Sequence, residues 1–376
     1  MHGVTGPDTD RKLGPITLGL LVLRVGVLLI ALQVGSTRPL ADDLSRFREI
    51  STTPGTPYRT FPVEYAPGEV LFIESIGSAD ARTLAQRLAI FAFLADIATW
   101  AAVGYGWGRR AAERYLWMGA PLLVFIYTRF DLVPLALAAW GASLLVRGAQ
   151  RSGGLSFAAA ILTKVWPIVL LPAFVVSGRR RGSAWAASAL VIGMAGWLAF
   201  AGTDNVREVL TFRHAQGWGV ESTVGVWVWI ATGGPVRLEA GAPRVGTAPD
   251  WATASLALLL LLALAGIWFL AWRRKRAAFG AAAVAAVGAL LACSPLFSLQ
   301  YAAWLLPWGA VAWVDGDRRF AAIVAAITVL TAVLFMVYQP DRAGLAQFLL
   351  LGRNALVVAL PVVWLLPERS RASEAD

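Results

Sequence analysis

Long apolar segments recur along most of this chain, and short clusters of basic residues separate them. Hydrophobic residues fill 58% of the 376 positions and charged residues only 15%, with a mean hydropathy of +0.63. An ordinary soluble domain is only about 45–50% apolar. A helix that crosses the hydrocarbon core of a bilayer needs roughly 20 apolar residues. The sequence therefore predicts an all-α polytopic membrane protein.

We predict a single integral membrane domain, residues 1–366, built from eleven or twelve transmembrane or half-membrane helices. The predicted segments are residues 15–35, 85–107, 114–128, 131–147, 155–163, 165–177, 183–201, 251–272, 278–293, 299–314, 320–338 and 345–366. The first segment is long enough to span and no clear cleavage pattern follows it, so we expect it to be retained. Residues 367–376 are predicted to form a short cytoplasmic tail.

The basic clusters predict an orientation, because Lys and Arg are enriched in cytoplasmic loops. The clusters are Arg11-Lys12, Arg109-Arg110, Arg147 with Arg151, Arg179 to Arg181, Arg273 to Arg276, and Arg318-Arg319. All of them lie on one side only if residues 155–176 enter and leave on that side, as two half-helices bent near Lys164 and Pro167. A proline favours such a break because it removes a backbone hydrogen bond. We expect both termini in the cytoplasm and two large outer segments, residues 36–84 and 202–250.

Composition argues against several classes of function. One cysteine, Cys293, rules out an intramolecular disulfide, and two histidines leave no cluster with the spacing of metal ligands. The net charge of +10 is spread over short clusters rather than one basic face, so we expect no nucleic acid partner. No cofactor and no metal are predicted, although loop acids such as Asp42 and Glu64 leave a divalent ion as an alternative.

Acidic residues follow the first apolar segment directly. Seven of them lie between Asp42 and Asp80, interleaved with arginines. Asp42 or Asp43 is a candidate general base, held at the membrane surface where it can take a proton from a hydroxyl group. The alternative is that these aspartates cap a helix that begins at Leu44.

Three charged residues stand between or inside apolar segments. Arg129 and Asp131 occupy a tight turn, where they either bind a ligand or form a mutual ion pair. Lys164 interrupts an apolar run with no acidic neighbour in sequence, which favours a phosphate partner. The alternative for Lys164 is that its side chain extends to the interface.

Polar residues elsewhere complete the candidate set. In the second outer segment, Arg213 and His214 are candidates for phosphate binding, Trp218 for stacking on a sugar ring, and Glu221 for accepting sugar hydroxyls. Membrane-interface anchoring is the alternative for the tryptophan. Further along, Gln300 and Tyr301 are either ligand contacts or helix-start groups. Arg353 in the last span is expected to face the bundle interior.

Ordered motifs suggest a family. Residues 57–68, Pro-Tyr-Arg-x-Phe-x-Val-Glu-Tyr-x-Pro-Gly, resemble the first outer loop of the actinobacterial family 87 glycosyltransferases. This DUF2029 group includes polyprenyl-phosphate-mannose-dependent mannosyltransferases. Agreement continues in order at residues 129–132, 163–167 with 171–172, and 297–301 with 304–307, and residues 213–222 also resemble a stretch of that family. The resemblance covers about residues 15–365. The chain departs from the family pattern at Thr60, Ala66 and Leu299 and in a slightly short linker from Asp43 to Gly55.

The resemblance implies a GT-C type bundle, a lipid-phosphate-linked sugar donor and catalysis at the outer face. It also implies that an aspartate just after the first span is the catalytic base, which maps to Asp43 or its neighbour Asp42, with Asp43 preferred. The run at residues 57–68 that resembles the family adds Tyr58, Arg59, Glu64 and Tyr65 as substrate-binding candidates.

We therefore expect a hexosyltransferase of the plasma membrane, most simply a mannosyltransferase. An inverting transfer would move the sugar from a polyprenyl-phosphate donor to a lipid or glycan acceptor, and nearby cations would stabilise the departing phosphate. Membrane lipids are the other expected partners. The alternatives are a lipid or sugar transporter, which predicts inverted repeats and broken helices, and a noncatalytic envelope scaffold.

Overall fold

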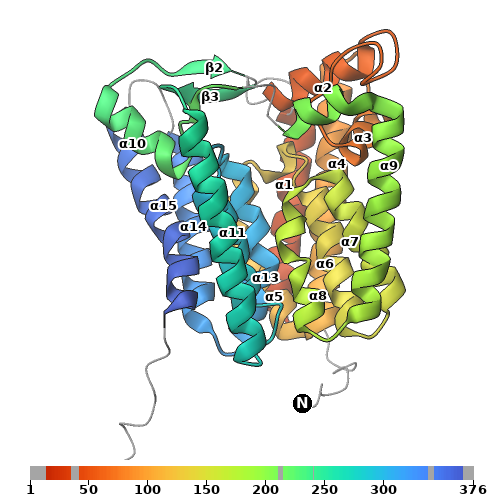
Figure 1. Cartoon of the computed structure of the whole chain (residues 1–376), viewed down its shortest axis with the longest axis vertical. Coiled ribbons are helices and arrows are strands. Elements are labelled where there is room, and N and C mark those ends of the chain that lie inside the picture. Colours follow the sequence, from red (N-terminus) through yellow and green to blue (C-terminus); the bar gives the residue numbers. More distant parts are fainter. Residues whose placement is uncertain (1–13, 35–41, 211–214, 240, 338–342, 367–376) are drawn as a thin grey trace, which may run out of the picture.

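The computed structural model describes residues 14–34, 42–210, 215–239, 241–337 and 343–366. Its helices run side by side in one bundle (Figure 1). The helices are α1 (Pro15–Val34), α2 (Asp42–Thr52), α3 (Pro67–Ile76), α4 (Ala81–Trp107), α5 (Arg109–Gly119), α6 (Leu132–Val146), α7 (Gln150–Thr163), α8 (Pro172–Val176), α9 (Arg180–Leu210), α10 (Thr223–Thr232), α11 (Asp250–Arg273), α12 (Ala281–Cys293), α13 (Leu306–Val314), α14 (Arg318–Val337) and α15 (Ala343–Leu365). Short 3-10 helices are η1 (Ala120–Val124), η2 (Ile126–Thr128), η3 (Trp166–Leu170) and η5 (Leu299–Leu305).

Six of these helices are long and apolar enough to cross a bilayer: α1, α4, α9, α11, α14 and α15. The remaining bundle helices are shorter, and several continue as 3-10 turns. Proline explains part of this, since Pro167 and Pro172 begin new helical segments where a continuous helix would lose a hydrogen bond. The chain is therefore an all-α polytopic membrane protein, as its sequence predicts.

The segment from α7 to α8 forms the predicted hairpin. The Gly182 backbone N–H, at the start of α9, donates to Gln150 Oε1 at the start of α7, over 3.2 Å. Arg179 Nη2 likewise donates to the carbonyl oxygen of Val146, 3.2 Å away. Both ends of the hairpin thus lie at the same end of the bundle, and Lys164 lies at its tip, directly after α7.

The basic clusters gather at that end too. Arg274 Nη1 donates to the carbonyl oxygen of Trp364 near the end of α15 over 2.9 Å, and Arg276 pairs with Asp317 at 3.7 Å. Arg147 Nε donates to the Tyr105 carbonyl oxygen over 2.7 Å. We call this the basic end of the bundle; Arg11-Lys12 lies outside the described residues. This common placement agrees with the predicted arrangement of the loops.

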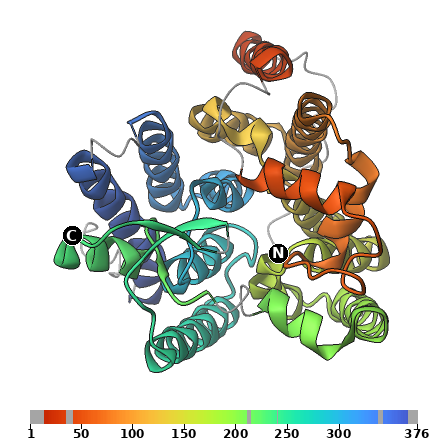
Figure 2. The ribbon, with the colours of Figure 1, turned by 90° about the horizontal axis from the view of Figure 1, so that it is seen from above.

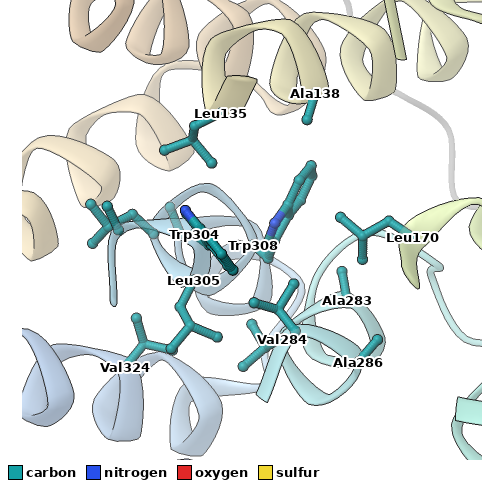
Figure 3. Close-up of a cluster of buried hydrophobic side chains, with 14 of the residues drawn as sticks. Leu135, Ala138, Leu170, Ala283, Val284, Ala286, Trp304, Leu305, Trp308 and Val324 are labelled. Carbon is teal, nitrogen blue, oxygen red and sulfur yellow. The ribbon is translucent and has the colours of Figure 1, made fainter. Parts of the chain in front are cut away.

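Small residues let the centre of the bundle pack closely. Almost every residue of α12, a run rich in alanine, is buried. Figure 3 shows Trp304 and Trp308 between residues of α6 and residues of α12. The Trp304 ring also stacks on Trp166 of η3, with centroids 4.9 Å apart. The aromatic rings of η3, η5 and α13 thus fill the space that the alanines leave.

The opposite end of the bundle, which we call the sheet end, carries the two segments that the sequence predicts to be outer segments. Helices α2 and α3 pack on a buried cluster that includes Phe47, Ile50 and Phe130. Beyond α9, three short strands form an antiparallel sheet in the order β1-β3-β2: β1 (Trp218–Gly219), β2 (Arg237–Glu239) and β3 (Ala242–Val245). β2 and β3 lie over the end of the bundle (Figures 1 and 2). The sequence interpretation did not anticipate this sheet, and it placed the start of α2 two residues late, at Leu44.

Candidate functional site

A cavity of about 560 Å³ opens at the sheet end, between the two outer segments and the bundle. Its walls come from α2, α3, the tip of the α7–α8 hairpin, α12, the start of η5 and the sheet. The polar and charged lining residues are Ser45, Arg46, Glu49, Glu64, Tyr65, Glu69, Asp131, Lys164, Arg244, Ser294, Ser298, Gln300 and Tyr301. The cavity therefore joins carboxylates and cations at the level where the apolar helices end.

Lys164 and Asp131 form an ion pair at the floor of this cavity. Lys164 Nζ lies 3.0 Å from Asp131 Oδ1, and Trp304 Nε1 donates to the same oxygen over 2.9 Å. Burial lowers the pKa of Lys164, but Asp131, Glu69 and Tyr301 outweigh that effect and raise it, so the lysine stays charged. Lys164 thus has an acidic partner that lies far from it in sequence, and the sequence interpretation did not foresee this pair.

Glu69 is a cavity residue that the sequence interpretation missed. It lies in the first turn of α3 and only 4% of it is exposed. The preceding Gly68 permits this position, because a Cβ there would lie 2.8 Å from the Cα of Thr163 on α7. The close approach of α3 to α7 brings Glu69 near Lys164, whose pKa it helps to raise.

Arg46 of α2 is held by two carboxylates. Arg46 Nη2 lies 2.9 Å from Glu64 Oε2, and Arg46 Nη1 lies 2.7 Å from Glu49 Oε1. These contacts tie α2 to the loop before α3, and their combined effect raises the Arg46 pKa despite burial. Helix α2 begins at Asp42, but the side chains of Asp42 and Asp43 lie outside the described part of the structure.

The sheet contributes Arg244, another residue that the sequence interpretation did not single out. It lies on β3 and only 2% of it is exposed. Arg244 Nη1 donates to the carbonyl oxygen of Gly217 over 2.7 Å, and Nε donates to that of Glu239 over 3.2 Å. Arg244 is one arginine among many in a Gly- and Pro-rich loop, and only the fold reveals that it is buried at a cavity.

Several predicted binding residues lie away from the cavity walls. The Tyr58 hydroxyl donates to the carbonyl oxygen of Tyr65, and its ring is buried in the cluster under α2 and α3. Arg59 lies over the Phe200 ring, 4.5 Å from its centroid, on an exposed surface. Trp218 is 3% exposed and packs with Val220 and Val226, so stacking on a sugar ring is wrong for this residue.

Arg353 and Glu221 connect α15 to the sheet region. Arg353 is fully buried, which confirms that it faces the bundle interior. It donates to the carbonyl oxygen of Glu221, to which Asn354 Nδ2 also donates over 3.2 Å. Burial raises the pKa of the Glu221 carboxyl, while Arg353 and Arg129 oppose that shift. None of these three charged residues lines the cavity.

The cavity thus unites only part of the predicted set, namely Glu64, Tyr65, Asp131, Lys164, Gln300 and Tyr301. Arg213 and His214 lie outside the described residues. No cluster of three or more His, Cys, Asp or Glu side chains with the arrangement of metal ligands occurs in the described residues. The sequence matches no protein-family model and no curated protein.

Proposed function

We propose that this protein is a GT-C type membrane glycosyltransferase, similar to the family 87 enzymes. It would move a hexose, with mannose as the first expectation, from a polyprenyl-phosphate donor to a lipid or glycan acceptor. The sheet end would face the outside of the plasma membrane, and both termini would lie in the cytoplasm, as the basic clusters favour. The single observation that carries the proposal is the cavity in which carboxylates and cations meet at the end of apolar helices.

The proposed reaction is one inverting displacement. A carboxylate removes the proton from an acceptor hydroxyl as that oxygen attacks the anomeric carbon. The bond from the anomeric carbon to the phosphate oxygen breaks, and its electron pair leaves with the polyprenyl phosphate. Phosphate is a good leaving group, so the reaction needs no general acid. Cations at the cavity would stabilise the charge that develops on the leaving oxygen.

The helical period of α2 suggests which aspartate is the base. Ser45, Arg46 and Glu49 of this helix line the cavity, whereas Phe47 and Ile50 belong to the buried cluster. Position 42 precedes the lining residues by three, four and seven positions, which is the spacing of one helix face. Position 43 instead precedes Phe47 and Ile50 by four and seven. We therefore prefer Asp42 as the base, in place of Asp43.

The test is sugar transfer by the purified protein in lipid nanodiscs. Polyprenyl-phosphate-mannose would be offered with a panel of lipid and glycan acceptors, and products would be detected by mass spectrometry. We expect transfer by the wild type and a loss of roughly 100-fold or more in Asp42→Asn, because general base catalysis contributes about 10²–10⁴-fold. Asp43→Asn and the exposed Glu74→Gln on α3 are the matched controls.

Full activity of a folded Asp42→Asn variant would refute its assignment as the base, and loss in Asp43→Asn alone would return that role to Asp43. A folded wild-type protein that neither transfers sugar nor binds any polyprenyl-phosphate sugar would contradict the proposed function itself.

A further inference from the structure

Arg244 differs from the other cations that line the cavity in how its charge is balanced. Lys164 pairs with Asp131 at 3.0 Å, and Arg46 pairs with both Glu49 and Glu64. Within the described residues, Arg244 bonds to backbone carbonyl oxygens alone. A buried cation without a carboxylate partner is costly, because carbonyl dipoles only partly replace the water that it has lost.

One nitrogen of this guanidinium is available to a ligand. Nε and Nη1 are used by Glu239 and Gly217, while Nη2 donates to no atom of the described residues. Arg244 itself lines the cavity, so its guanidinium lies within reach of a ligand there. Burial lowers the pKa of Arg244 despite the nearby Glu239, but arginine stays protonated in proteins.

The sheet holds the guanidinium in a fixed place. In the register of the sheet, Arg244 lies opposite Gly219 on β1 and Arg237 on β2. A Cβ at Gly217 would lie 2.8 Å from the Arg244 Cβ, so a glycine is needed for this approach. The Glu239 carboxylate, which accepts from the Gly217 backbone N–H over 3.1 Å, keeps the same loop in position.

Other polar groups line the same cavity. The phenol of Tyr301 acts electrostatically on both Arg244 and Lys164, so the two cations are close to the same side chain. Ser298, which also lines the cavity, adds a neutral hydroxyl group, whereas the Ser294 hydroxyl already donates to the carbonyl oxygen of Leu296. The cavity thus combines a cation that makes no ion pair within the described residues with a hydroxyl donor, as an anion requires.

We propose that Arg244 binds the phosphate group of the substrate, and that the sheet is therefore part of the binding site rather than a cover for it. The inference rests on the proposed function for the identity of the ligand, a phosphate ester carried on a polyprenyl lipid. Arg244 supplies a charge-assisted hydrogen bond to a phosphate oxygen, whereas Lys164 is already neutralised by Asp131.

The experiment measures binding of polyprenyl phosphate, without a sugar, to the full chain in zwitterionic nanodiscs. Arg244→Gln should weaken binding by roughly 10- to 100-fold, since a hydrogen bond to a charged group is worth about 1.5–3 kcal/mol. Arg244→Lys should recover part of the affinity because it keeps the charge. Arg237→Gln is the matched control, since it removes the same charge from the neighbouring strand and should bind as the wild type does.

Competition separates the two sources of the phosphate. Displacement of polyprenyl phosphate by a similar concentration of inorganic phosphate supports an anion site that reads the phosphate alone. Displacement only by polyprenyl phosphates supports a site for the lipid-borne ester.

The proposal is overturned if a folded Arg244→Gln variant, verified by its thermal transition, binds like the wild type. It is equally overturned if Arg237→Gln loses as much affinity, or if the folded wild type binds no polyprenyl phosphate. Sugar transfer by the wild type with unchanged donor binding in Arg244→Gln would reject the Arg244 assignment alone. Arg244-dependent binding without any sugar transfer would reject the glycosyltransferase and leave the anion site in place.

Discussion

Two cation–carboxylate pairs of nearly equal length occupy very different surroundings. Arg24 Nε lies 2.9 Å from Asp96 Oδ2 inside the bundle, and Lys164 Nζ lies 3.0 Å from Asp131 Oδ1 at the cavity. The Arg24 and Asp96 side chains are 1% and 5% exposed, whereas 22% of the Lys164 side chain is exposed. The first pair is sealed, and the second has one partner open to solvent or ligand.

The sealed pair is also fully bonded. Asp96 accepts from the hydroxyls of Tyr115 and Tyr127 over 2.6 and 2.8 Å, and Arg24 donates to two backbone carbonyl oxygens as well. Helix α1 stands at the edge of the bundle (Figure 2). Only 11% of the most apolar stretch of this helix is buried. The Arg24–Asp96 pair therefore joins a peripheral helix to α4. The two pairs have nearly the same length, and they differ in exposure and in their sets of bonding partners.

The largest effect on stability is expected from Asp96→Asn. The substitution leaves Arg24 charged and buried without its counter-ion, which typically costs about 3–5 kcal/mol. Unfolding in detergent, followed by tryptophan fluorescence, measures the loss. Glu113→Gln is the control, because the half-exposed Arg109–Glu113 pair should contribute less than about 1 kcal/mol. If Asp96→Asn unfolds within 1 kcal/mol of the control, the sealed pair is not a structural tie.

Asp131→Asn should lower sugar transfer more than it lowers stability, the reverse of what we expect for Asp96→Asn. Lys164 is partly exposed and can be solvated from the cavity, so we expect a smaller loss of stability, about 1–3 kcal/mol. Sugar transfer should fall strongly, because the lysine at the cavity floor loses the group that orients it. Parallel unfolding and transfer assays on both variants test the contrast. If Asp96→Asn and Asp131→Asn showed the same ratio of activity loss to stability loss, the two ion pairs would not differ in role.

Tyr127→Phe sharpens the description of the sealed pair. It removes one hydroxyl donor from Asp96 while the carboxylate keeps Arg24 and Tyr115. A hydrogen bond to a charged group contributes about 1.5–3 kcal/mol, so the variant should lie between the wild type and Asp96→Asn in unfolding experiments. Transfer activity should be unchanged after correction for the folded fraction, and a specific loss of activity would connect this network to the cavity.

The smallest effect is expected at the basic end, from the pH dependence of Asp315. Burial and the neighbouring Asp317 raise the pKa of its carboxyl to about 6, above the ordinary value of about 3.9. A raised pKa means that the folded state binds the proton more tightly. Stability from this group is therefore fully present below pH 4 and is lost as the pH rises through 6. The side chain nevertheless keeps contact with solvent, so the loss should stay below about 1 kcal/mol.

Unfolding experiments between pH 4 and 7 with Asp315→Asn alongside measure this contribution. The variant should lose the pH-dependent component of stability that the wild type shows in this range. An identical pH profile for the two proteins would contradict the assignment to Asp315.

Apolar periodicity and charge were sufficient to predict the bundle from the sequence. The hairpin followed from Pro167 and from the need to place Arg179 and Arg273 at one end. Pairings across the bundle were not accessible, because Lys164 meets Asp131 only through the packing of α7 on α6. Arg24 and Asp96 are charges inside apolar segments, a pattern that predicts a buried partner for each of them but does not identify it. The sheet gave no signal, since its strands are two to four residues long.

The hairpin also constrains how the protein is made. Neither α7 nor α8 is long enough to cross a bilayer, so the two halves must enter it together. The charge at the hairpin tip reaches the membrane only after α6 has been synthesised, because Asp131 precedes Lys164 in the chain. The counter-ion has therefore already been synthesised when the lysine follows. The order of synthesis means that Lys164 never has to enter the bundle before its partner exists.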